Sequence, residues 1–231
     1  MRLSILIPVF NEESTISRVL SKVEKVNIPW KKEIIVINDG STDGTAKILS
    51  TYAKTVSKNN IRIITHPTNR GKGVALQSGI KKVSGDYILI QDADLEYDPE
   101  EIPLLIGEVK NNPEAAVYGS RLMKKNPVMP LLYILGNRFL TFMTNFLCQT
   151  TLTDMETGYK LLPTRAAKRM QLKSSRFDIE PEITVQLVKL GIPIVEVPIS
   201  YRGRSHLAGK KLTLKDAYSA LFALLYFRFR P

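Results

Sequence analysis

The stretch that decides the fold is DYILIQDADLEYDP, which covers residues 86–99. It begins with an unbroken run of apolar residues, typical of a strand that is buried on both faces. Asp92 and Asp94 follow at the end of this run, with one small residue between them. Asp98 and Pro99 then suit the N-cap and the first position of a helix. A buried strand that ends in carboxylates and leads into a helix is typical of an α/β sheet with a ligand site at its strand ends.

Similar apolar runs recur on both sides of this stretch, separated by segments with apolar residues at helical spacing or with helix-capping residues. Strands are predicted over residues 3–9, 33–38, 61–65, 86–91, 115–119 and 194–200, and helices over 16–26, 71–83, 98–110 and 180–190. This alternation predicts an α/β fold with a mostly parallel central sheet and helices on both faces, a Rossmann-like arrangement.

The composition is that of a globular protein. The chain has 231 residues, of which 44% are hydrophobic and 24% charged, and this excludes a disordered tail, a collagen and a coiled coil. The single cysteine, Cys148, excludes an internal disulfide framework and a cysteine-based zinc site. The 33 basic and 22 acidic residues leave a net charge of +11. This charge suggests an anionic partner, namely nucleic acid, a membrane surface or a phosphorylated substrate.

Asp92 and Asp94 form a candidate metal site. Carboxylate oxygens at this spacing can hold Mg²⁺ or Mn²⁺ and leave coordination positions open for phosphate oxygens. Glu96 could add a third carboxylate. The alternative for this motif taken alone is a solvated acidic turn in front of a helix.

Three other strands also end in loops that carry polar residues or glycine. These loops cover residues 8–12, 38–43 and 69–73. Together they predict a crevice with an aromatic side chain, acidic groups for ribose hydroxyls, and Lys72 near a helix N-terminus for phosphate. The chain contains neither a GxGxxG dinucleotide motif after its first strand nor a P-loop.

Seven short motifs occur along the chain in the order PVFNE, INDGSTD, NRGKG, QDADLEYDP, VYGSR, DMETGYKLL and FDIEPEI. Together they resemble glycosyltransferase family 2, in the branch of the dolichyl-phosphate mannose and dolichyl-phosphate glucose synthases. The resemblance implies a GT-A catalytic domain over residues 1–212, followed by an apolar C-terminal helix over 213–231 at the membrane interface. It also implies inverting transfer of a hexose from a nucleotide sugar, GDP-mannose or UDP-glucose, to dolichyl or another polyprenyl phosphate.

The resemblance further implies roles for individual residues. The donor nucleotide sugar is bound by Pro8, Phe10, Glu12, Ile37, Asp39, Asp92, Ala93, Asp94, Arg121 and Lys211, together with Lys72. The divalent ion, Mg²⁺ or Mn²⁺, is held by Asp92, Asp94 and Glu96, the last standing where the synthases often carry Gln. The acceptor phosphate is bound by Arg121, Arg138 and Arg204. Catalysis is carried by Asp92, Asp94, Arg121 and Arg204.

The chemistry of the acceptor decides which further residues are needed. A phosphate monoester, whose second pKa is about 6, is largely dianionic at neutral pH and needs no general base. It needs positive charge, which Arg121, Arg138, Lys160, Arg202 and Arg204 can supply. A sugar hydroxyl as acceptor would instead require a base, for which Glu180 and Glu182 are the candidates.

Two apolar stretches suit a lipid acceptor. Residues 129–148 enclose Arg138 among large apolar side chains, and residues 216–229 are apolar nearly all round. Core helices or a homodimer interface are the alternatives. The N-terminal run predicts a strand rather than a signal peptide. The chain has no run of about 18 uncharged apolar residues, so a membrane-spanning helix is not expected. We therefore expect a peripheral protein on the cytoplasmic face of the membrane, as a homodimer or with a separate membrane-anchoring subunit.

Two other functions compete with this interpretation. A family 2 enzyme acting on a saccharide hydroxyl in cell-surface polysaccharide synthesis shares the donor motifs. A nucleic-acid-binding module would explain the net charge of +11, but no binding motif is present and the acidic strand ends would repel phosphate without a metal. We therefore expect no nucleic acid partner. His66 and His206 have no metal-site spacing and are expected to be structural or loop residues.

Overall fold

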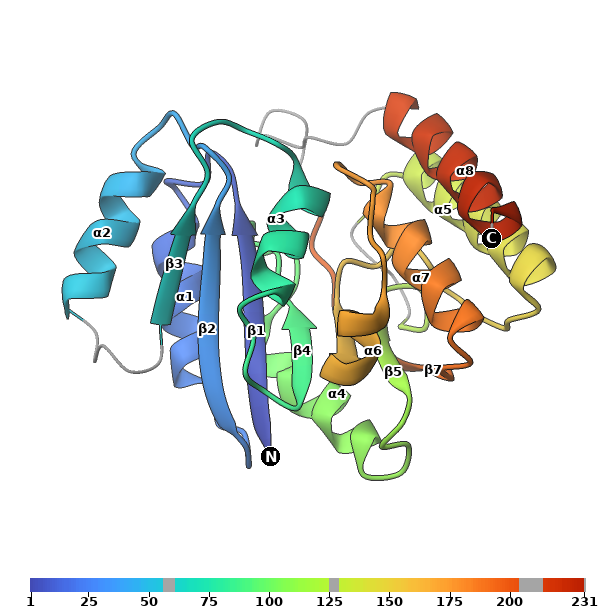
Figure 1. Ribbon diagram of the computed structural model, residues 1–231, viewed down its shortest axis with the longest axis horizontal. Helices are drawn as coiled ribbons and strands as arrows, with labels where there is room; N and C mark the ends of the chain where they lie inside the picture. Colours follow the sequence, from blue (N-terminus) through green and yellow to red (C-terminus); the bar gives the residue numbers. More distant parts are fainter. Residues whose placement is uncertain (56–60, 125–128, 204–213, 231) are drawn as a thin grey trace.

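The structure is a computed structural model that describes residues 1–55, 61–124, 129–203 and 214–230. One mixed sheet runs through it in the order β3-β2-β1-β4-β6-β5-β7 (Figure 1). Its strands are β1 Arg2–Val9, β2 Lys31–Asn38, β3 Ile61–Thr65, β4 Tyr87–Ile90, β5 Ala116–Ser120, β6 Lys160–Pro163 and β7 Ile194–Pro198. The predicted α/β class and the six predicted strands are confirmed.

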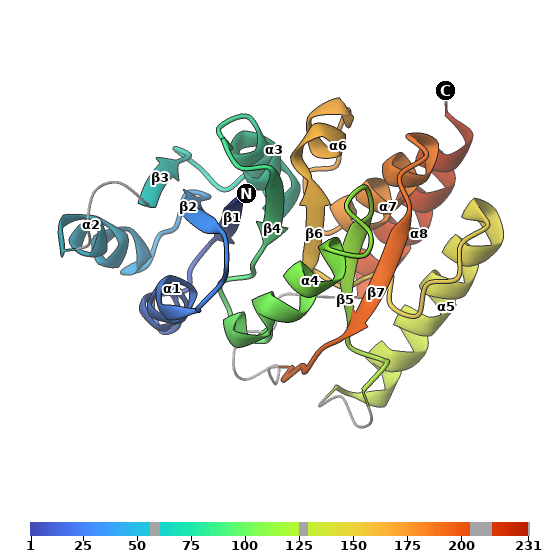
Figure 2. The ribbon, with the colours of Figure 1, turned by 90° about the horizontal axis from the view of Figure 1, so that it is seen from below.

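The helices are α1 Ile16–Lys25, α2 Thr45–Thr55, α3 Lys72–Ile80, α4 Ile102–Val109, α5 Leu131–Cys148, α6 Thr164–Arg169, α7 Ile179–Lys189 and α8 Leu214–Phe229, with a short 3₁₀ turn at Pro99–Glu101 before α4. Figure 2 shows α1 and α4 on one face of the sheet, and α3, α6 and α7 on the other. Both faces of the central strands are therefore covered, which explains why their sequences read as continuous apolar runs.

The strand register brings the loops after β1, β2 and β4 to one edge of the sheet. β1 pairs in parallel with both β2 and β4, with Ile7 opposite Val36 and Leu6 opposite Ile90. β6 is antiparallel to both β4 and β5 and separates them. This strand was not predicted, because its four residues, KLLP, are too few to show a period.

The core has one layer on each face of the sheet. Leu3, Ile5 and Ile7 of β1 pack toward α1 and α4, whereas Leu6 packs toward α3 and α7. This alternation follows from the strand geometry, in which successive side chains point to opposite faces. Burying a side chain of this size stabilises the fold by about 1.5–3 kcal/mol.

Helices α5 and α8 lie side by side along the outer side of α7 (Figure 1). Leu140 and Ala220 pack together in one small cluster, and Cys148 and Leu224 in another. Among the described residues, α5 is the one helix that is long and apolar enough to cross a membrane by its length and composition. The sequence argument against a spanning helix was that no uncharged apolar run of about 18 residues exists, and Arg138 interrupts the run in α5, so that expectation stays a prediction.

Candidate active site

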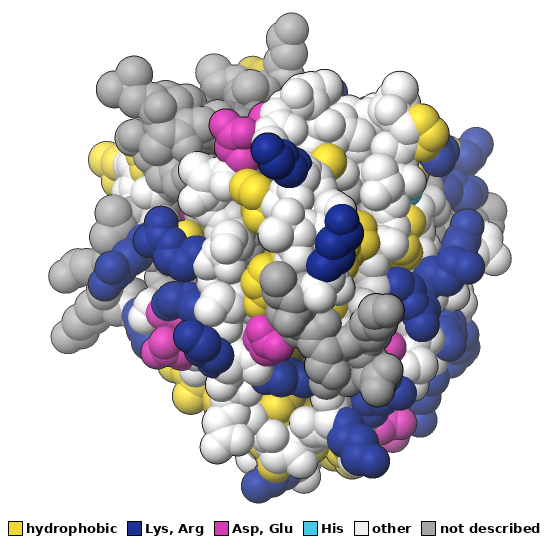
Figure 3. Space-filling model, turned by 90° about the vertical axis from the view of Figure 1, so that its left-hand side faces the viewer, with side chains coloured by type: hydrophobic (Ala, Val, Ile, Leu, Met, Phe, Trp, Pro, Cys, Tyr) yellow, Lys and Arg dark blue, Asp and Glu magenta, His cyan; other side chains and the backbone are white. Residues whose placement is uncertain are grey.

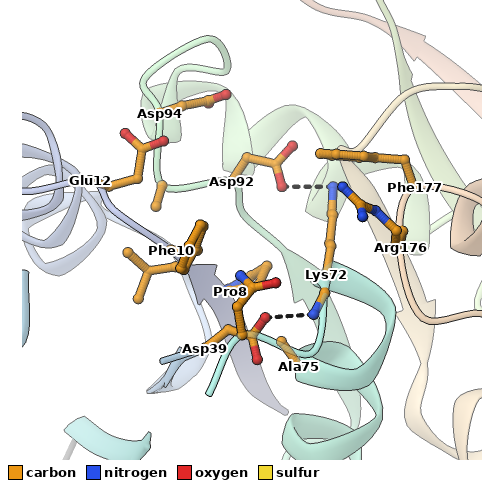
Figure 4. A pocket seen from close by; sticks show the side chains of 14 residues that line it. Pro8, Phe10, Glu12, Asp39, Lys72, Ala75, Asp92, Asp94, Arg176 and Phe177 are labelled. Atoms are coloured by element: carbon orange, nitrogen blue, oxygen red, sulfur yellow. Dashed lines mark hydrogen bonds and ion pairs between the residues drawn. The ribbon is translucent and has the colours of Figure 1, made fainter. Parts of the chain in front are cut away.

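A cavity of about 300 Å³ lies where β1, β2 and β4 end and α3 begins (Figure 4). It is lined by Pro8, Val9, Phe10, Glu12, Asp39, Asn69, Gly71, Lys72, Ala75, Asp92, Ala93, Asp94, Arg176 and Phe177. Eight residues predicted to bind the nucleotide sugar are among them: Pro8, Phe10, Glu12, Asp39, Lys72, Asp92, Ala93 and Asp94. The strand ends thus gather one acidic wall and one basic residue around a single pocket, which we call the donor pocket.

Ile37, predicted to contact the nucleotide, does not line the donor pocket, and this expectation is corrected. Its side chain is fully buried in the core layer between the sheet and α3. A Cβ added at Gly79 of α3 would lie 2.9 Å from Ile37 Cδ1. Because β2 is buried on both faces, its sequence could not show which residues face the core and which face the strand end.

Asp39 fixes the loop that leads into α3. The backbone N–H of Gly71 donates to Asp39 Oδ2 at 2.7 Å, and that of Arg70 donates at 3.0 Å. His66 Nδ1 lies 2.6 Å from Asp39 Oδ1, and its other ring nitrogen lies 2.9 Å from Ser78 Oγ. Asp39 therefore sets the position of the helix that carries the lysine of the pocket.

Lys72 extends from the start of α3 to Asp92. Its Nζ lies 2.7 Å from Asp92 Oδ1 and 3.0 Å from Glu180 Oε1 (Figure 4 draws the first contact). Burial alone would lower the pKa of Lys72, but Asp92 and Glu180 outweigh it and raise the pKa well above its ordinary value. Lys72 is thus held as a charged ammonium at the wall of the donor pocket.

Glu180, in the first turn of α7, also pairs with Lys160 of β6. Burial alone would raise the pKa of Glu180, but Lys160 and Lys72 lower it below its ordinary value. The Lys160 side chain is fully buried and also donates to the carbonyl of Met155 at 3.2 Å. The expectation that Lys160 supplies charge to a phosphate is therefore wrong, because its ammonium is enclosed by protein.

The carboxylates expected to hold a metal point in different directions. Asp92 points to Lys72, whereas Asp94 lies on the side of Glu12 (Figure 4). Glu96 accepts a hydrogen bond from the hydroxyl of Tyr201. Within the described part of the chain, no three His, Cys, Asp or Glu side chains are grouped so that they could hold a metal. The expectation of Glu96 as a third ligand is thus corrected, since its carboxylate is turned to Tyr201.

Asp92 and Asp94 alone still fit a divalent ion. Mg²⁺ in such sites is bound through one or two carboxylates and completes its coordination with substrate phosphates and water. Both aspartates line the donor pocket, so their oxygens lie where a diphosphate could share the ion.

Arg121 lies outside the donor pocket, contrary to its predicted role at the phosphates. Its Nε and Nη2 each donate to the fully buried carboxylate of Asp154 at 2.7 Å. Asn137 of α5 donates to the same carboxylate at 2.6 Å, and the Tyr201 ring lies 5.1 Å from the guanidinium carbon. The physical reason is the strand order, because β6 separates the end of β5 from β4.

The remaining residues predicted to bind the acceptor are either exposed or outside the described part of the chain. Arg138 is exposed on α5 and does not line the donor pocket. Arg202 is exposed, and its backbone N–H donates to the carbonyl of Glu96 at 3.1 Å. Arg204, Lys211 and His206 lie outside the described residues.

Arg176 and Phe177 line the donor pocket but were not predicted to do so. They lie between α6 and α7, and Figure 4 shows both side chains beside Lys72. This segment approaches the start of α3 closely, because a Cβ at Gly71 would lie 2.2 Å from the carbonyl oxygen of Ser175. The two glycines that flank Lys72 are the sequence signal that a backbone packs there.

The comparisons with known proteins agree with this architecture. A family described as "Glycosyl transferase family 2" matches residues 4–170. An uncharacterized protein of Methanocaldococcus jannaschii is 30% identical, over 94% of this chain and 92% of that protein. The dolichyl-phosphate beta-glucosyltransferase of Dictyostelium discoideum is 31% identical, over 91% of this chain and 68% of that protein. The human protein of the same name is 30% identical, over 91% of this chain and 69% of that protein.

Among solved structures, the chain is similar to glucosyl-3-phosphoglycerate synthase from Mycobacterium tuberculosis, crystallised with Mn²⁺, UDP and phosphoglyceric acid. The TM-score is 0.77 at 18% identity, over 100% of this chain and 79% of that chain. The fold is thus the GT-A fold of glycosyltransferases. The chain belongs to glycosyl transferase family 2, and the protein is a glycosyltransferase.

Proposed function

We propose that the protein transfers glucose from UDP-glucose to a polyprenyl phosphate such as dolichyl phosphate, with inversion at the sugar carbon and with a divalent ion. Relatives about 30% identical over most of this chain are named dolichyl-phosphate beta-glucosyltransferases. Several solved structures with the same fold contain UDP. These names favour UDP-glucose over GDP-mannose, which the sequence left open.

The observation that carries the choice of acceptor is the state of the two carboxylates at the start of α7. Glu180 is paired with Lys72 and Lys160. Glu182 is fully buried and accepts hydrogen bonds from the backbone N–H groups of Lys173 and Ser174, both at 2.8 Å. Neither can accept a proton from a sugar hydroxyl, which such an acceptor requires. A phosphate acceptor, already dianionic, needs no base, so this geometry supports a lipid phosphate.

The donor pocket offers groups for each part of a nucleoside diphosphate. Phe10 and Pro8 offer an apolar wall for the base, while Asp92 and Asp94 would hold the divalent ion, Mg²⁺ or Mn²⁺. When bound, that ion offsets the negative charge of the leaving diphosphate. Arg176 presents a guanidinium at the same pocket, where bidentate contacts to a phosphate are available.

A membrane surface suits the outer side of α5 and α8. The exposed large side chains there, which we call the apolar face, are Leu131, Leu132, Leu135, Phe139, Phe142, Phe146, Tyr218, Phe222, Leu225 and Phe229. Monomeric soluble proteins rarely expose so many contiguous apolar groups. We place this face at the boundary of a lipid bilayer, where a lipid acceptor resides. Arg138, exposed on α5 within this face, is then near the level of the lipid phosphates.

The net charge of +11 adds a general attraction to anionic lipid. The positive charge is also present far from the apolar face. The side of the molecule that carries α2 and β3 shows many Lys and Arg side chains and few Asp and Glu (Figure 3). The buried thiol of Cys148 fits a reducing compartment, so we propose a peripheral location on the cytoplasmic face. A second copy of the chain, or a separate anchoring subunit, as its partner at the membrane stays a proposal.

A donor panel tests the proposed function. The protein is incubated with polyprenyl phosphate, Mg²⁺ and radiolabelled UDP-glucose, GDP-mannose or UDP-GlcNAc. We expect label to enter an organic-extractable product that mild acid releases, with UDP-glucose the best donor. A water-soluble labelled saccharide would instead identify a hydroxyl acceptor, and no turnover with any donor would contradict the proposal.

A further inference from the structure

Four side chains of alternating charge, two buried and two partly buried, lead from the core to the donor pocket. They are Lys160, Glu180, Lys72 and Asp92, with neighbours in contact at each step. The exposed fraction of these side chains is 0%, 4%, 11% and 21% in this order. Removing one member would leave a neighbour as an uncompensated buried charge, so the row holds its members in place.

One oxygen of Asp92 is paired in this arrangement, and the other lies against the chain backbone. Oδ1 is 2.7 Å from the Lys72 ammonium. Beside Oδ2 lies the backbone of Gly158, where an added Cβ would be 2.5 Å from Oδ2 and 3.1 Å from Lys72 Nζ. The residue at position 158 must therefore be glycine for the Lys72–Asp92 pair to form in this position. Asp92 cannot offer Oδ1 to another cation unless the ammonium shifts.

The Lys72 ammonium is held in this position from two sides. Glu180 Oε1 lies 3.0 Å from its Nζ, and Glu180 is itself bound by Lys160. At the other end of the side chain, the hydrogen bond from Gly71 to Asp39 fixes the start of α3.

We propose that Lys72 is a built-in counter-ion that covers Asp92 until a metal-bound diphosphate displaces it, and that Glu180 and Lys160 are positioning residues for Lys72. The inference rests on the metal dependence of the proposed function. In the absence of nucleotide, a metal ion that approaches Asp92 finds its charge already neutralised by Lys72, and the Lys72 ammonium lies beside it. Repulsion between two cations that share one carboxylate corresponds to about tenfold or more in affinity, even at the dielectric constant of water. A diphosphate adds negative charge for both cations, so metal and donor bind together.

The test is a Mn²⁺ titration, followed by the EPR signal of free Mn²⁺, with and without UDP. The first variant is Asp92→Asn, which keeps the size of the side chain. Without UDP it should lose less Mn²⁺ affinity than it loses with UDP, because Lys72 already covers Asp92 in the nucleotide-free protein. With UDP it should bind about tenfold or more weakly, because Asp92 has then become a ligand.

The second variant is Lys72→Met, with Lys72→Arg as the matched control that keeps the charge. Lys72→Met should bind Mn²⁺ without UDP about tenfold more tightly than wild type, and Lys72→Arg should not. The gain should disappear in the Lys72→Met, Asp92→Asn double variant. Circular dichroism checks that each variant is folded, and Lys72→Gln replaces Lys72→Met if it is not.

Two results would overturn the inference. One is an Asp92→Asn protein that loses Mn²⁺ affinity equally with and without UDP. The other is a folded Lys72→Met or Lys72→Gln protein that binds Mn²⁺ alone no more tightly than wild type. A wild-type protein that binds no UDP in the presence of Mn²⁺ would instead contradict the proposed function, while the nucleotide-free arms would still decide the role of Lys72.

Discussion

The donor pocket and the apolar face are built on opposite principles. Around the pocket, charged side chains are buried or half-buried. The carboxylates of Asp92 and Glu180 are each paired with a lysine ammonium. On the outer side of α5 and α8, large apolar side chains are exposed, with Phe146 at 74% and Phe229 at 72%. In the first region, the charges are paired within the protein. In the second, large apolar side chains are exposed to water, which is unfavourable. The comparison supports the proposal that the protein itself supplies the donor site and leaves its acceptor side to a lipid surface.

The largest expected effect comes from breaking the link between the sheet and α5, a helix of the apolar face. Asp154 joins Arg121 of the loop after β5 to Asn137 of α5. Asp154→Ala should lower the free energy of unfolding by about 3–5 kcal/mol, because it leaves Arg121 buried without a partner. Urea denaturation measures the change. A loss below about 1 kcal/mol would show that α5 is held to the sheet by other contacts.

The same pair predicts a pH dependence. Burial would raise the pKa of Asp154, but the Arg121 guanidinium outweighs it and lowers the pKa below its ordinary value. A carboxyl with a lowered folded-state pKa contributes stability above its unfolded pKa of about 3.9, and this contribution is lost as the pH falls through the folded-state value. Asp154→Ala and wild type should therefore differ less in stability at strongly acidic pH than at pH 7.

The second effect isolates the donor pocket. Asp94→Ala should lower turnover by about 100-fold or more, since even residues that only support a metal ligand are worth 10–100-fold. The fold should persist, because the side chain lies at the edge of the pocket. Glu100→Ala, an exposed carboxylate after the same strand, is the matched control. Full activity of Asp94→Ala, or of wild type in EDTA, would exclude the proposed metal role.

The third effect separates donor from acceptor. Arg176→Ala should weaken UDP-glucose binding by about 10- to 150-fold, the equivalent of one charge-assisted contact of about 1.5–3 kcal/mol. Arg138→Ala should leave UDP-glucose binding unchanged and instead raise the KM for the lipid phosphate. Calorimetry with UDP-glucose and kinetics in polyprenyl phosphate distinguish the two. The reverse pattern would exchange the roles of these arginines.

The smallest effect concerns the apolar face. Phe142→Ser and Phe146→Ser should each weaken binding to anionic liposomes by roughly tenfold, as expected for one large side chain withdrawn from the bilayer. Leu104→Ser, which changes an exposed apolar residue of α4, should leave liposome binding unchanged. Flotation at low salt measures the bound fraction. Equal flotation of all variants would assign binding to charge alone, and equal failure would favour a protein partner.

The part of the site that the sequence predicted is the part made by strand ends. Asp39, Lys72 and Asp92 could be placed together because parallel strands bring the loops after them to one edge. Lys160 was misassigned, and the burial of Arg121 was not foreseen, because their partners, Glu180 and Asp154, lie 20 and 33 residues away, and only the folded chain shows that these pairs are buried. A basic side chain in the sequence does not show whether a carboxylate already neutralises it.

The second half of the fold was less predictable for a related reason. The short antiparallel strand β6 sets the places of β5 and α7, and with them those of Arg121 and Arg176. Its four residues, Lys-Leu-Leu-Pro, carry no period from which a strand or its direction can be inferred. Sequence pattern thus gave the donor side of the site, and tertiary packing decided the rest.

The most direct test of the account is a comparison of acceptors that differ only in the phosphate. Wild-type protein with labelled UDP-glucose and Mg²⁺ is given polyprenyl phosphate, the corresponding polyprenol, or a soluble oligosaccharide. The account predicts labelled lipid with polyprenyl phosphate, and background with the other two, because Glu180 and Glu182, the candidate bases for a hydroxyl acceptor, are buried and paired. Turnover with the polyprenol or the oligosaccharide at a rate comparable to that with polyprenyl phosphate would contradict it.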